Sequence, residues 1–169
     1  MRGKSEPCRI LGVDPGSRIT GWGVIDKVGS DLVLVAQGSI RMSKGATLQE
    51  RLGTIHAELA LIIESHGPQV VAVEAPFAGL NVRSLIQLSH ARGVVLLAAQ
   101  LAGLEVFEYA PRSVKSAVVG YGGAEKAQVE KMVRLLVKGA SLAKMGPDAA
   151  DAIAVAICHA HSARLTTMR

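Results

Sequence analysis

The sequence predicts an α/β domain in which helices flank a mixed five-stranded sheet. The chain has 169 residues, the size of one ordinary domain. Short apolar runs typical of strands alternate with longer segments whose apolar residues recur at helical spacing. Hydrophobic residues make up 49% of the chain and aromatic residues only 3%, so Ala, Val, Leu and Ile must fill the core, as they do in helix-covered sheets. We expect one domain over 1–169, with 1–8 and 165–169 as flexible tails.

The first part of the chain predicts three strands joined by tight turns. Residues 9–14 form a short apolar run that ends before Pro15 and Gly16, and further runs cover 19–26 and 31–42. Because turn-forming residues separate these runs, we expect an antiparallel meander.

The remainder alternates helices and strands. Thr47 precedes apolar residues spaced three and four apart, which predicts a helix over 47–66 with Thr47 as its N-cap. Residues 69–74 are almost uniformly apolar, as a central strand would be, and 105–109 form another short strand. Further helices are expected over 82–102, 111–118, 124–138 and 147–164.

Charge and cysteine content restrict the class of protein. The chain has 19 Lys and Arg against 14 Asp and Glu, a net charge of +5, which suits a polyanionic partner or simply aids solubility. Its two cysteines lie far apart without metal-ligand spacing, as expected for reduced thiols. With neither an apolar signal segment nor a membrane-spanning run, we expect a cytoplasmic protein without membrane contact.

Four carboxylates occupy positions that their apolar surroundings make unusual. Asp14 and Glu74 each end a strand, and Asp148 and Asp151 lie three residues apart on one face of the last helix. Strand-end acids can meet at the carboxyl edge of a sheet, where a docked helix would add its two aspartates. A turn, a strand end or a helix cap explains most of these acids singly. Asp151 fits such explanations least, because burying a lone carboxylate in an apolar helix is costly.

Together, the acids indicate a divalent-metal site. Gathered carboxylates raise one another's pKa unless a cation neutralises them. Oxygen ligands without His or Cys spacing favour Mg²⁺, with Mn²⁺ as a substitute, over zinc. Four carboxylates can hold two ions about 3.5–4 Å apart, which would clamp the attacking and leaving oxygens of a phosphodiester.

At these residues the chain resembles the RuvC family of bacterial Holliday-junction resolvases, which have the ribonuclease H-like fold. The resemblance extends from about residue 9 to 163. Its motifs are Gly-Val-Asp-Pro-Gly-Ser at 12–17, Thr-Gly-Trp-Gly at 20–23, Glu74 with Phe77, His-Ala-Arg-Gly at 90–93, Tyr109 through Lys115, Gly120 through Lys126, and Asp-Ala-Ala-Asp at 148–151.

The resemblance implies a homodimeric crossover junction endodeoxyribonuclease. Such enzymes bind a four-way (Holliday) DNA junction and nick two opposing strands symmetrically, by divalent-metal-dependent hydrolysis that leaves 5′-phosphate and 3′-hydroxyl ends, in homologous recombination and DNA repair. The implied partner is the RuvA–RuvB branch-migration complex. The implied catalytic metal ligands are Asp14, Glu74, Asp148 and Asp151.

Five residues are candidate DNA contacts: Phe77, Arg83, Arg112, Lys115 and Lys126. Lys115 and Lys126 match basic DNA-contact positions of the family, and Phe77 matches an aromatic residue near the junction centre. Ala75 and Pro76 stand where some relatives carry other residues, a difference that affects how the loop presents Phe77. The alternatives are a core role for Phe77 and an ordinary solvated face for the basic residues.

The apolar helix over 82–102 has more surface to bury than one sheet can cover. It is therefore a candidate dimer interface, with Leu85, Leu88 and Leu96 as trial contacts, or else a deeply buried central helix.

Three other functions fit the sequence less well than a junction-resolving nuclease does. An inert junction-binding protein would not need all four acids, and an actin-like ATPase would need a longer chain. An RNA-processing nuclease of the YqgF type shares the fold, but the basic series and the Asp-Ala-Ala-Asp helix favour a resolvase.

Overall fold

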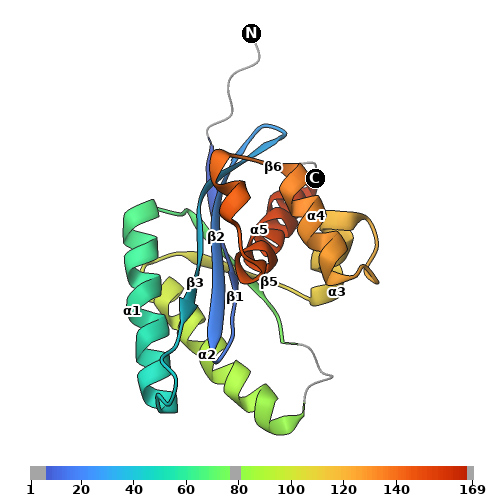
Figure 1. Ribbon diagram of the computed structural model, residues 1–169. Coiled ribbons are helices and arrows are strands. Elements are labelled where there is room, and N and C mark those ends of the chain that lie inside the picture. Colours follow the sequence, from blue (N-terminus) through green and yellow to red (C-terminus); the bar gives the residue numbers. More distant parts are fainter. Residues whose placement is uncertain (1–6, 77–80, 167–169) are drawn as a thin grey trace.

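A central sheet with helices on both faces organises the chain (Figure 1), and the computed structural model describes residues 7–76 and 81–166. No helix within these residues is long and apolar enough to cross a membrane. The elements are β1 Cys8–Asp14, β2 Ile19–Val28, β3 Asp31–Arg41, α1 Leu48–His66, β4 Val70–Glu74, α2 Val82–Leu101, β5 Glu105–Tyr109, α3 Pro111–Val119, α4 Lys126–Leu136, β6 Val137–Lys138, the 3₁₀ helix η1 Ala140–Lys144, and α5 Pro147–Thr166. The first strand and last helix thus extend into the segments expected as tails.

The sheet has the order β5-β4-β1-β2-β3-β6. β1, β2 and β3 form the expected antiparallel meander, while β4 and β5 run parallel to β1. The prediction of five strands was wrong, because the sheet has six. The additional strand, β6, is short, lies at the edge of the sheet and pairs parallel to β3. The helix expected to reach residue 138 ends at Leu136, because Val137 turns into the core, where only 2% of it is exposed, and pairs with Leu32.

Alternation along β1 decides which way its last residue faces. Leu11 and Val13 pack in the core between the sheet and helices α1 and α2, whereas Ile10 packs in the opposite core with α3, α4 and α5. Asp14 therefore shares the face of Ile10, since side chains two apart point the same way. The same parity places Glu74 of β4 on this face, two positions after Ala72.

Helix α5 lies unusually close to the sheet because glycines face it. A Cβ atom on Gly12 of β1 would lie 2.1 Å from the Ala152 carbonyl oxygen, and one on Gly21 of β2 would lie 2.0 Å from the Asp148 oxygen. Every residue of α5 from 149 to 160 is buried except Asp151. These contacts hold the acid-bearing end of α5 over β1 and β2.

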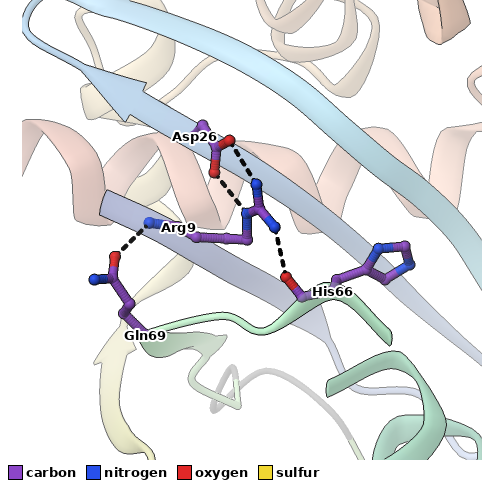
Figure 2. Close-up of polar contacts among 4 residues, drawn as sticks. All are labelled: Arg9, Asp26, His66 and Gln69. Atoms are coloured by element: carbon purple, nitrogen blue, oxygen red, sulfur yellow. Dashed lines mark hydrogen bonds and ion pairs between the residues drawn. The ribbon is translucent and has the colours of Figure 1, made fainter. Parts of the chain in front are cut away.

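A polar network fixes the amino-terminal end of β1 (Figure 2). The Arg9 guanidinium donates to both carboxylate oxygens of Asp26, at 2.7 and 2.8 Å, and to the His66 carbonyl at 2.7 Å. The Arg9 backbone N–H donates to Gln69 at 2.8 Å. This network joins β1, β2 and the α1–β4 connection at the end of β1 opposite Asp14.

Candidate active site

The four predicted acids meet at the carboxyl edge of the sheet. Val13 pairs with Val73, so Asp14 and Glu74 are the next residues of two adjacent parallel strands. The two side chains influence each other's pKa, and the charge of Asp151 acts on both. The backbone oxygen of Asp148 lies directly over Gly21 of β2. Residues up to 137 positions apart in the sequence are thus neighbours.

Burial and mutual repulsion raise the pKa values of three of the four acids. Burial, followed by the charges of Glu74 and Asp151, raises the pKa of Asp14 to about 7. Burial also raises the pKa of Glu74 and of Asp151. Near neutral pH, Asp14 is therefore protonated in part of the molecules.

Each helix acid is paired with a basic side chain. Lys126 Nζ lies 2.5 Å from Asp151 Oδ2, and Arg41 Nη2 lies 3.4 Å from Asp148 Oδ2. The Asp151 contact raises the pKa of Lys126, which is the first residue of α4 and lies between the capping-box residues Glu125 and Gln128. Two cations thus partly neutralise the acidic cluster.

Two cavities flank Glu74. One, of about 170 Å³, is lined by Asp14 and Glu74 with Leu88 and Arg92 of α2. The other, of about 320 Å³, is lined by Glu74 and Asp151 with Lys115 and Lys126. The acids are therefore open to a ligand from two sides.

The four acids have the oxygen ligands that a hard divalent cation prefers, but their side chains are not arranged around a common ion position. Within residues 7–76 and 81–166, no group of three His, Cys, Asp or Glu side chains is assembled for metal binding. Four carboxylates, three of them with raised pKa values, are nevertheless the donors that Mg²⁺ prefers, and a cation would relieve their repulsion. The residues that could hold it are Asp14, Glu74, Asp148 and Asp151.

The predicted DNA contacts fall in different places. Lys115 and Lys126 lie beside the acids, and Arg112 is exposed in the first turn of α3. Arg83 lines an apolar groove on α2, outside both acid-lined cavities. Phe77 lies outside the described residues.

Sequence reasoning missed two arginines near the acids. Arg41 is the last residue of β3, and its guanidinium contacts Asp148 of α5. Arg92 pairs with Glu108 of β5, and its Nε is buried without a partner among the described residues. Arg92 stands inside the His-Ala-Arg-Gly motif, but no pattern marked Arg41, because its contact depends on where α5 docks.

A stability measurement should report the raised pKa of Asp14. Its folded value, about 7, exceeds the ordinary 3.8, so the folded protein binds a proton that the unfolded chain releases. Stability should therefore fall as pH rises from about 4 to 7, by up to roughly 4 kcal/mol. In chelator-treated protein, the free energy of unfolding of Asp14→Asn should depend less on pH than that of the wild type, as measured by denaturant unfolding. Asp31→Asn, an exposed carboxylate at the far end of β3, should keep the wild-type profile; equal profiles for all three proteins would contradict the pKa of Asp14.

Fold and acidic site together define a nuclease with the ribonuclease H-like fold, and comparison with known proteins makes this specific. Residues 10–159 match the family described as crossover junction endodeoxyribonuclease RuvC. The chain therefore belongs to the RuvC family.

Individual relatives span nearly the whole chain. It is 47% identical to the RuvC of Agrobacterium fabrum, over 91% of this chain and 89% of the relative, and 49% identical to that of Syntrophotalea carbinolica, over 95% and 98%. The structure of T. thermophilus RuvC in complex with Holliday junction substrate superposes with a TM-score of 0.85 at 34% identity, covering 95% of this chain and 97% of that one. These matches confirm the family and fold that the sequence motifs predicted.

Proposed function

We propose that this chain resolves four-way DNA junctions by symmetric hydrolysis of two opposing strands at the acidic site, leaving 5′-phosphate and 3′-hydroxyl ends. The observation that carries the proposal is the convergence of the four acids beside Lys115 and Lys126. Carboxylates that gather metal supply the chemistry of phosphodiester hydrolysis, and lysines that attract phosphate position the DNA. The family resemblance extends the proposal to action in the cytoplasm, with RuvA–RuvB as a partner, in recombination and repair.

The proposed cofactor is Mg²⁺, or Mn²⁺ in its place, with two ions per site. Bound metal would activate the attacking water and stabilise the leaving oxygen. The chain would contribute the ligands: Asp14 would bind the metal in its deprotonated form, and the helix acids would exchange Arg41 and Lys126 for the metal. Both cations then become available to phosphate oxygens at the same edge of the sheet.

Lys115 is suited to hold the DNA strand near the acids. It lines the cavity that contains Glu74 and Asp151, and its charge lowers the pKa of Glu74. A lysine in this position attracts a phosphate without reading the base, as positioning contacts do.

The proposed activity predicts a specific pattern of cleavage. Purified protein should nick a synthetic four-way junction in Mg²⁺, leave a linear duplex of the same sequence intact, and cut neither when Mg²⁺ is replaced by chelator. The products should be 5′-phosphate nicks that ligase seals. Equal cutting of duplex and junction, or cutting in chelator, would contradict the proposal.

We also propose that two copies of the chain act together, because two strands must be cut on one junction. Four exposed residues of α2 support this. They lie on one side of the helix and form the α2 apolar face: Val82, Ile86, Leu97 and Leu101, exposed by 50% to 73%. Such a face suits an interface with two-fold symmetry. The trial contacts Leu85, Leu88 and Leu96 fit less well, because all three are half-buried and Leu88 lines the Asp14 cavity.

The dimer should be visible without DNA. At micromolar concentration the protein should sediment as a dimer, and Leu97→Glu should give folded monomers because a charge cannot be buried unpaired in an apolar interface. Leu135→Glu, which alters an even more exposed leucine on α4, should remain dimeric. A wild-type protein that stays monomeric even on a junction would exclude the dimer.

A further inference from the structure

A second basic surface lies beside the acids, on the flank away from Lys115. A cavity of about 580 Å³ opens between the start of β2, the end of β3 and the segment leading into α1. We call it the β3 basic cavity. None of the described residues that line it is acidic, and four of them are basic: Arg18, Arg41, Lys44 and Arg51.

The strand order puts this cavity in line with the acids. Asp14 pairs with Gly21 near the start of β2, and Ile19 of β2 pairs with Arg41 at the end of β3. The ends of β3, β1 and β4 therefore follow one another along a single edge of the sheet. Along this edge, the acids lie between Lys115 and Lys126 on one flank and the β3 basic cavity on the other. The Arg41–Asp148 ion pair connects the cavity to the acids.

The charges in this cavity are available to a ligand. Arg18 and Lys44 are exposed, and neither forms an ion pair with any carboxylate in residues 7–76 and 81–166. The Arg41 side chain is 64% exposed, with its contact to Asp148 at 3.4 Å. Arg51 instead donates to the Ser17 carbonyl at 3.2 Å and so shapes the wall. With only the Arg41–Asp148 contact among the described residues to offset them, the four cations repel one another, and a bound anion would reduce that repulsion.

We propose that the β3 basic cavity binds backbone phosphates of the DNA strand on the side of the scissile bond opposite to that held by Lys115 and Lys126. This inference rests on the proposed function and names a further part of its DNA surface. A strand positioned for hydrolysis needs contacts on both sides of the bond, because small misplacements of the reacting atoms are costly. Arginine side chains match the paired oxygens of a phosphate, and such contacts do not depend on base sequence.

The test removes one positive charge at a time, either in the cavity at the end of β3 or beside the start of β3. Lys44→Ala and Arg18→Ala remove exposed cations of the cavity. Lys138→Ala is the matched control: its side chain is 68% exposed, and it pairs with Val33, eight residues before Arg41 and roughly 26 Å from it along the strand. Junction binding is measured in chelator over a range of KCl concentrations, so that no DNA is cut. Lys44→Arg tests whether the charge alone restores binding.

Each cavity variant should bind the junction more weakly than the wild type. Its plot of log affinity against log salt should fall less steeply, by about 0.9 in slope. Lys138→Ala and Lys44→Arg should match the wild type in both affinity and slope. Unchanged slopes in both cavity variants, or an equal loss in Lys138→Ala, would overturn the inference. Nicking by the wild-type protein is measured separately. If the wild type nicks normally but the slopes are unchanged, only the phosphate-binding role of the β3 basic cavity is refuted. If the wild type does not nick, the proposed function is refuted, and the slopes still show whether the cavity binds phosphate.

Discussion

Replacing any one of Asp14, Glu74, Asp148 or Asp151 by its amide should abolish nicking while junction binding stays close to normal. The amide keeps the size of the side chain but loses a metal-binding carboxylate, whereas affinity depends mainly on phosphate contacts. Because metal assistance contributes several kcal/mol, the expected loss of rate is on the order of a thousandfold or more. The measurements are single-turnover nicking in Mg²⁺ and junction affinity in chelator.

Asp31→Asn serves as the control, because it removes an exposed carboxylate at the opposite end of the sheet. It should nick at the wild-type rate. An amide variant that still cuts within tenfold of wild type would exclude that acid from the site. A variant that loses binding and cutting together would instead show that the acid supports the fold.

Gly12→Ala should strongly destabilise the protein, because α5 cannot remain in place. The new Cβ atom would lie 2.1 Å from the Ala152 oxygen and 2.9 Å from the Ala156 nitrogen, both of them backbone atoms that no rotamer change can move. We expect a loss of about 3 kcal/mol or more, which corresponds to a fall in Tm of roughly 6–12 °C. Thermal unfolding provides the measurement.

Gly53→Ala offers the matched comparison. Gly53 lies in the interior of α1, and a Cβ atom there would meet nothing within 4 Å. Alanine should therefore stabilise the protein by roughly 0.5–1 kcal/mol. Gly21→Ala, which opposes the Asp148 backbone, should behave like Gly12→Ala and also reduce nicking. A mild effect at both strand glycines would mean that α5 docks less closely than these contacts require.

The secondary structure was largely predictable, because its signals are local. Thr47 and Glu50 form the capping box that starts α1, and Gly67 ends that helix in a left-handed conformation. The strands before Asp14 and Glu74 are short apolar runs bounded by turn residues. β6 was missed because Val137 continues the helical spacing of α4, and only its pairing with Leu32 makes it a strand.

The sequence by itself determined the family, the strands that end in acids, and the helix whose two aspartates share one face, because these depend on residue type and short spacing. Only the tertiary structure decided that Arg41 reaches Asp148, that Lys126 pairs with Asp151, and that basic side chains lie on both flanks of the acids. Those contacts join residues 25 to 107 positions apart. They depend on strand order and on how closely α5 packs on glycine-bearing strands, which local patterns do not encode.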